Sequence, residues 1–165
     1  MILVVGVAEG RAQSYNQQVE TAWNSLRNMA CDNARTATQT AEAAAKQHDA
    51  MEQAVQQVPT LQSVPEDVAR DTTRSMKDAL RDMRGIARDV RSISQDMKRI
   101  CSEDIRLRNS RDAAKKYDDR SQTINAAVNR YNALVEEYGE TIRQFNEAAI
   151  VLTMHGSTLN QLETE

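Results

Sequence analysis

Few residues in this 165-residue sequence have side chains that could take part in chemistry. The candidates are two cysteines, Cys31 and Cys101, and two histidines, His48 and His155. Neither histidine belongs to a repeated metal-ligand spacing, and the Glu-x-x-His pair of di-iron bundles does not occur in the sequence. It also lacks glycine-rich phosphate loops and nucleophile elbows. We therefore expect no catalytic residue, metal, cofactor or small-molecule substrate.

The two cysteines are predicted to be too far apart for a disulfide. A helical hairpin that turns near Leu61 places Cys31 level with about Ser92, and Cys101 level with about Ala22. The cysteines would then be separated by roughly 14 Å along the helix axis, beyond the Cα separation that a disulfide tolerates. This count predicts two free, half-buried thiols.

Long helices must position these residues, because helix breakers are rare. The chain has only 5 glycines, 2 prolines and 4% aromatic residues, a composition typical of long helices packed through small side chains. Both prolines lie in the segment 58–65, which we predict to connect the first two helices. Ser63 and Glu66 have the spacing of a capping box, so a helix should begin there. A second break is predicted at Asn109-Ser110, with one continuous helix from Pro65 to Leu152 as the alternative.

Apolar residues repeat at heptad spacing in each of the three segments, which is typical of helices that bury one stripe against partner helices. The first segment is rich in alanine, the second alternates apolar with charged residues, and the third begins a new register at Tyr117. The residues that we expect to pack between helices are Trp23, Leu26, Met83, Ile86, Val90, Ile93, Met97, Ile100, Tyr131, Val135, Tyr138, Ile142 and Phe145. His48 falls on the same stripe and is predicted to be a core residue.

These patterns predict an all-α fold, an elongated antiparallel bundle of three long helices with coiled-coil-like packing. Each helix should have about 44 residues. A division of the bundle into four helical segments is the alternative. We assign residues 1–13 to an apolar N-terminal arm, 14–155 to the bundle and 156–165 to a polar tail.

The N-terminal arm begins with eight apolar or glycine residues, too few to span a bilayer. Two interpretations remain open for it. The arm docks on the bundle or on a neighbouring subunit, or it is the remainder of a longer membrane anchor. In either case the residues expected to make the attachment are Ile2, Leu3, Val4, Val5 and Val7.

The formal net charge of -3 gives the chain no basic field for nucleic acid. The arginine-rich stretch between Arg70 and Arg111 is interleaved with Asp and Glu, so we interpret it as a solvated, ion-paired helix face.

Two stretches carry a recognisable pattern, with Arg130-Tyr131-Asn132 before Tyr138 in one and Tyr15-Asn16 before Ala22-Trp23 in the other. Together they resemble the LemA family of membrane-associated helical proteins. The segment 124–138, with Arg130-Tyr131-Asn132 and then Tyr138, is similar to the closing helix of that family, as is the following 141–146. An apolar leader followed by Tyr15-Asn16 and Ala22-Trp23 is similar to the family's entry into its first helix. The middle of the chain departs from the family, and Asn146 stands where the family usually has proline. The resemblance implies a bacterial, membrane-tethered helical protein without established catalytic activity.

The expected function is therefore that of a non-enzymatic structural scaffold, a homo-oligomer associated with the bacterial cell envelope through its N-terminus. Membrane lipid or another helical protein are further candidate partners. The alternatives are a subunit of an extracellular filament or tube whose arm docks into the next subunit, and a soluble adaptor that binds a partner's helix.

Overall fold

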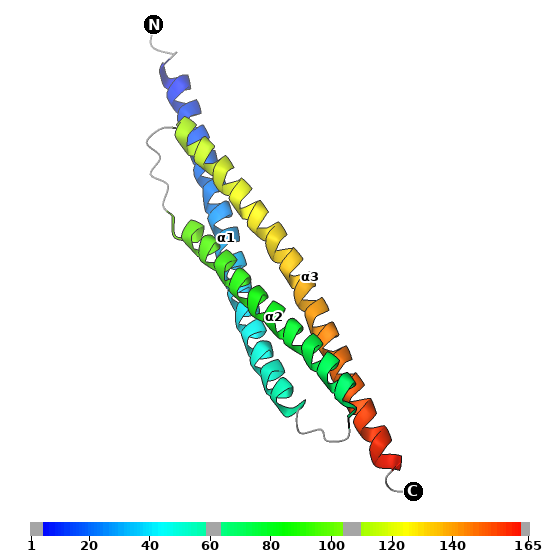
Figure 1. Cartoon of the computed structure of the whole chain (residues 1–165). Helices are drawn as coiled ribbons and strands as arrows, with labels where there is room; N and C mark the ends of the chain where they lie inside the picture. The colour runs from blue at the N-terminus through cyan, green and yellow to red at the C-terminus, as the bar shows by residue number, and fades with distance from the viewer. Residues whose placement is uncertain (1–4, 59–63, 104–109, 163–165) are drawn as a thin grey trace. The chain divides into compact units, whose positions relative to one another are not determined.

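The chain folds into three packed α-helices, as a computed structural model shows (Figure 1). The backbone is described over residues 5–58, 64–103 and 110–162, and the side chains over 17–58, 64–103 and 111–154. The helices are α1 (Val5–Gln57), α2 (Glu66–Cys101) and α3 (Ser110–Leu162). The predicted all-α fold with three packed helices is confirmed.

The predicted equal helix lengths are wrong, because α1 and α3 have 53 residues each and α2 has only 36. Helix α2 begins directly after Pro65, whose carbonyl accepts a hydrogen bond from the Ala69 amide (2.9 Å). It ends at Cys101, shortly before Asp104 would place a charge on the apolar stripe. The break predicted near Asn109 is confirmed, and the continuous second helix is not formed. Ser63, the expected cap, lies outside the described residues.

The helices also include parts of the segments that we assigned to the arm and the tail. Helix α1 already begins at Val5 and α3 continues to Leu162. Ile2, Leu3 and Val4 lie outside the described residues, as do the side chains of Val5 and Val7.

The chain divides into two compact units, each built from a section of all three helices. Unit 1 comprises residues 1–37 and 92–130, and unit 2 comprises residues 38–91 and 131–165. Within each unit α1 and α3 run in the same direction and α2 runs in the opposite one (Figure 1). Each unit is therefore a short antiparallel three-helix bundle.

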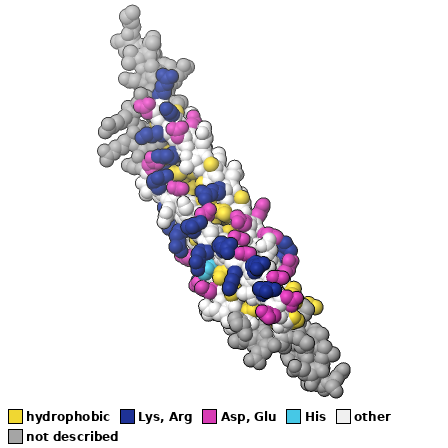
Figure 2. Space-filling model, viewed as in Figure 1, with side chains coloured by type: hydrophobic (Ala, Val, Ile, Leu, Met, Phe, Trp, Pro, Cys, Tyr) yellow, Lys and Arg dark blue, Asp and Glu magenta, His cyan; other side chains and the backbone are white. Residues whose placement is uncertain are grey.

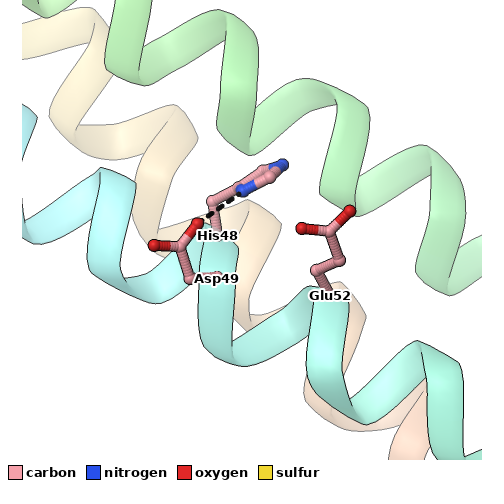
Figure 3. A group of neighbouring side chains, drawn as sticks. All are labelled: His48, Asp49 and Glu52. Carbon is pink, nitrogen blue, oxygen red and sulfur yellow. Dashed lines mark hydrogen bonds and ion pairs between the residues drawn. The ribbon is translucent and has the colours of Figure 1, made fainter.

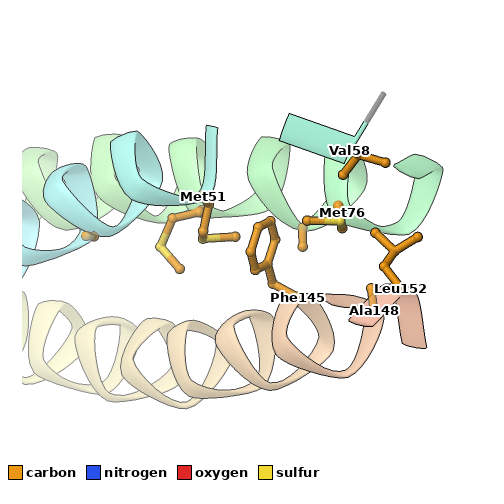
Figure 4. Packing of buried hydrophobic residues seen from close by; sticks show 9 residues of the cluster. Met51, Val58, Met76, Phe145, Ala148 and Leu152 are labelled. Atoms are coloured by element: carbon orange, nitrogen blue, oxygen red, sulfur yellow. The ribbon is translucent and has the colours of Figure 1, made fainter. Parts of the chain in front are cut away.

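The apolar stripe of α2 is buried as its heptad pattern predicts. Its members are at most 3% exposed: Met76, Ala79, Met83, Ile86, Val90, Ile93, Met97 and Ile100. In unit 2 the stripe meets Met51 of α1 and Phe145 of α3, whose ring points between Met51 and Met76 (Figure 4). Trp23 and Leu26 of α1 are also buried, at 4% and 5% exposed. Strict seven-residue spacing in α2 keeps one face of the helix toward its neighbours.

The predicted stripe of α3 is only partly correct. Phe145 is buried, and Tyr131, Tyr138 and Ile142 are half-buried, but Val135 is 40% exposed. The core position beside it is taken by Leu134, at 9% exposed. Apolar residues occur in adjacent pairs along α3, so a four-residue and a three-residue step from Tyr131 both reach an apolar side chain. The sequence pattern could not tell which member of the pair faces inward.

The surface of α2 carries the ion pairs that its sequence predicts. Four of them lie on this helix: Asp71–Arg74 (4.0 Å), Asp78–Arg81 (3.1 Å), Arg88–Asp89 (3.7 Å) and Asp96–Arg99 (3.2 Å). Figure 2 shows positive and negative side chains intermixed on the face that carries α2. None of the described helices is long and apolar enough to cross a membrane.

Candidate functional sites

The most distinctive chemical feature of the molecule is a disulfide between Cys31 of α1 and Cys101 of α2 (Cα–Cα 4.9 Å). It lies within unit 1 and joins residues that are 70 positions apart in the sequence. Both cysteines are half-buried, as predicted, but they are not free, so the prediction of two separate thiols is wrong.

The error arose from the assumed turning point of the hairpin. Cys31 lies level with Cys101 rather than with Ser92. The Ser94 hydroxyl donates a hydrogen bond to the Ala34 carbonyl (3.2 Å), so α2 is displaced from the predicted register in the same direction there. The predicted register placed residues at equal distances from Leu61 in the sequence at the same level, with an advance of about 1.5 Å per residue on both sides. A connecting segment can advance about 3.3 Å per residue when it is extended, so the second helix need not begin level with the end of the first.

Two further contacts fix the C-terminal end of α2 in unit 1. The Arg27 side chain donates a hydrogen bond through Nε to the Cys101 carbonyl (3.2 Å), which would otherwise have no partner within the helix. Glu103, just past the helix, accepts two hydrogen bonds from Arg120 of α3 (2.7 and 2.9 Å). We call these five residues the crosslinked junction: Arg27, Cys31, Cys101, Glu103 and Arg120.

The ion pair in the crosslinked junction shifts both of its members. The hydrogen bond from Arg120 lowers the pKa of Glu103 below its ordinary value, and the same bond raises the pKa of Arg120. Both side chains are about one-third exposed, at 28% and 36%, so solvent screens part of this interaction. The end of α2 is thus held covalently to α1 and electrostatically to α3.

Sequence reasoning identified neither the pairing in this junction nor its charged residues. One local signal was present, because Arg27 precedes Cys31 by four residues and therefore lies on the same face of α1. Glu103 and Arg120 have no comparable signal, since they come from either side of a break in the chain.

His48 is buried, as predicted, and it has two acidic neighbours on α1. Its Nδ1 lies 3.3 Å from Oδ1 of Asp49, and Glu52 is one turn further along (Figure 3). The ring points from α1 toward α2, and its Nε2 is buried without a hydrogen-bond partner. One ligand atom from each residue lies within 4.8 Å of the others, so these are the residues that could approach a common cation. All three come from two neighbouring turns of one helix, and we assign no ion to them.

The predicted aromatic residues have packing roles in the described chain. Tyr131 Oη forms a hydrogen bond with Oγ1 of Thr40 (2.7 Å), which joins α3 to α1 in unit 2. The Trp23 side chain is buried, and its Nε1 lacks a hydrogen-bond partner. These side chains bring helices together and do not converge on a reactive group.

Comparison with protein-family models, curated proteins and solved structures finds no match to this chain.

Proposed function

We propose that this protein is a non-enzymatic helical scaffold of the bacterial cell envelope, working in an oxidising compartment and associating with copies of itself. The observation that carries the proposal is that the inward-facing side chains pack the helices together. Along α2 every member of the apolar stripe is buried against the other helices, and the outward positions carry ion pairs with solvent access. Side chains arranged in this way stabilise a bundle, which suits a structural element.

The disulfide supports the choice of compartment. Disulfides persist in secreted and periplasmic proteins, whereas cytosolic thiols are kept reduced. Cys31 and Cys101 would be reduced in a bacterial cytosol, and the crosslinked junction would lose its covalent bond. The envelope or the cell exterior therefore fits this pair of cysteines best.

The apolar N-terminal sequence supports attachment to a membrane, as the resemblance to the LemA family implies. The alternative function, a filament or tube subunit, is supported by the same residues if they dock into a neighbouring copy. The membrane hypothesis and the filament hypothesis can be separated, because membrane attachment needs lipid and filament growth does not.

Vesicle flotation with the full chain tests the proposal. The oxidised protein should float with vesicles of mixed anionic and zwitterionic lipid, and a variant with Ile2, Leu3 and Val4 each replaced by Ser should stay at the bottom of the gradient. Sedimentation of the native chain without lipid, abolished by the same substitutions, would favour the filament instead. A chain that neither floats nor sediments would contradict both attachment hypotheses.

The redox part of the proposal has its own test. Cells that contain the protein are treated with acid to trap thiols, and free cysteines are labelled with a maleimide that adds mass. The expected result is no labelling until a reductant is added. Full labelling of both cysteines without added reductant would exclude the oxidising compartment.

A further inference from the structure

The exposed face of α2 in unit 2 carries more positive side chains than its ion pairs use. Seven arginine or lysine residues follow one another at steps of four and three positions, all of them exposed: Arg70, Arg74, Lys77, Arg81, Arg84, Arg88 and Arg91. Residues three and four apart are neighbours on a helix surface, so these side chains form one continuous row. We call this set the basic stripe. The described parts of α1 and α3 in the same unit contain only two further basic residues, Lys46 and Arg143.

Less than half of the basic stripe is neutralised within the chain. Three of its members form the ion pairs with aspartate described above: Arg74, Arg81 and Arg88. The other four recur every seven residues, and none of them forms an ion pair among the described residues: Arg70, Lys77, Arg84 and Arg91. These four positive charges are therefore accessible to an anion outside the chain.

The length of the basic stripe determines what kind of anion fits it. Arg70 and Arg91 are 21 positions apart, a distance of about 31 Å along the helix axis. Successive unpaired members are about 10 Å apart along that axis. Side chains spaced in this way cannot converge on one phosphate or carboxylate group. The stripe therefore fits an extended array of anions rather than a single small ligand.

One end of the basic stripe borders a hollow of about 520 Å³ beside Val58. Its charged lining consists of four cations and two carboxylates: Arg70, Arg74, Lys77 and Arg81, with Glu66 and Asp78. Ala69 and Thr73 complete the wall. The lining is positive on balance, and the hollow has room for one phosphate group between the basic side chains.

The surroundings of the basic stripe disfavour a protein partner. Stable protein interfaces bury a central group of apolar or aromatic side chains. The outward positions beside the stripe are Asp71, Asp78 and Gly85, which offer no such side chain. On the other side of the stripe, Leu80 and Ala87 already pack against the core of unit 2. A protein partner would gain only exposed ion pairs, which contribute little affinity.

A nucleic-acid duplex also fits the basic stripe poorly. Its phosphates follow two curved strands separated by grooves about 6 and 12 Å wide. A straight row about 31 Å long crosses those grooves, so only some of its cations meet a phosphate. The headgroups of an anionic lipid surface form a continuous layer and diffuse laterally. Each cation of the row therefore finds a phosphate there.

We infer that the basic stripe binds the phosphate headgroups of an anionic phospholipid surface. This inference rests on the proposed envelope function and specifies the class of lipid. A single apolar anchor binds a membrane reversibly, and a basic patch on the same protein makes the attachment stable. The stripe strengthens attachment through the apolar N-terminal residues and does not replace it.

The test compares how the full oxidised chain partitions onto vesicles of phosphatidylcholine alone and onto vesicles that also contain phosphatidylglycerol. The native chain should bind the second kind on the order of 100-fold more tightly, and about 0.5 M NaCl should remove the difference by screening exposed charges. Lys77→Gln with Arg84→Gln should weaken binding to the anionic vesicles about 30-fold. One basic residue near an anionic surface contributes about 1 kcal/mol, which is about fivefold in affinity.

The matched control is Lys46→Gln with Arg143→Gln, which removes the same charge from exposed positions on α1 and α3 of unit 2. It should change the affinity less than about threefold, because salt screens charges away from the contact. Circular dichroism should show unchanged helix content in both double variants. An equal loss of binding in the two double variants would overturn the inference. Displacement from the vesicles by duplex DNA or inorganic phosphate at matched phosphate concentration would do so as well.

The vesicle comparison separates this inference from the proposed function. Equal binding to both kinds of vesicle would overturn the role of the basic stripe and leave the apolar attachment standing. Binding that depends on phosphatidylglycerol and is unchanged when Ile2, Leu3 and Val4 are replaced by Ser would have the opposite meaning. It would support the stripe and contradict attachment through the N-terminus.

Discussion

Reduction of the disulfide is the perturbation whose effect follows most directly from the structure. Cys31 and Cys101 close a loop with a sequence separation of 70. In the chain-entropy description, a crosslink across about 70 residues lowers the entropy of the unfolded chain enough to stabilise the folded state by about 4 kcal/mol. At about 2 to 4 °C per kcal/mol for a chain of this size, reduction should lower Tm by roughly 10 °C.

The assay is thermal unfolding followed by circular dichroism, with and without a phosphine reductant at pH 7. The matched control is the double variant Cys31→Ala with Cys101→Ala, which should melt near the reduced native protein and should not respond to reductant. Hydrogen exchange adds a spatial test, because faster exchange should appear in unit 1, where the bond lies, before it appears in unit 2. A change in Tm below about 2 °C, with both thiols shown to be free after reduction, would refute the reasoning.

Four other substitutions test the packing, the ion pair and the helix backbone. Met83 is fully buried, so Met83→Ala should lower the free energy of unfolding by about 2 to 5 kcal/mol in urea denaturation. Glu103 has a lowered pKa in the folded state, so its ion pair stabilises the protein above the ordinary glutamate pKa and is lost as the pH falls through the lowered value. Glu103→Gln should therefore cost up to about 1 kcal/mol at pH 7 and less at pH 2, and an equal cost at both pH values would contradict the assignment. His48→Leu should raise Tm, because it removes a buried ring nitrogen that has no partner, and a lower Tm would show that this nitrogen is satisfied by water. A Cβ added at Gly85 meets nothing within 4 Å, so Gly85→Ala should stabilise α2 by about 0.5 to 1 kcal/mol, and a destabilised variant would reveal a neighbour at that position.

The part of the fold that the sequence predicts well is α2. Its apolar residues stand alone between charged ones, so Met83, Ile86 and Val90 have a single possible inward face. The break after it was also predictable, because Asp104 interrupts the apolar stripe. Local sequence determines which face of such a helix is buried, because moving a charged neighbour into the core would cost more free energy than burying the apolar residue provides.

The relative positions of the helices along their axes could not be predicted in this way. Displacing one helix along another by seven residues leaves the pattern of apolar contacts almost unchanged. The pattern therefore allows several residues of α1 to lie opposite Cys101. The register depends on the connection 58–65, and residue counting does not determine the path of that segment. The disulfide of the crosslinked junction, a contact between residues 70 apart, was missed for this reason.

The misassignment of Val135 has a separate cause, which lies in the number of apolar residues on α3. A helix that packs only within a three-helix bundle needs about two or three apolar positions per heptad, and α2 has two with charged flanks. Helix α3 has three, because Leu134 faces the core while Val135 stays 40% exposed beside it. Three apolar positions in one heptad allow more than one inward-facing set, so the sequence pattern alone does not decide which of them is buried. Leu134 rather than Val135 therefore takes the core position, and the packing of α3 against the other helices decides between them, not the spacing of apolar residues along the sequence.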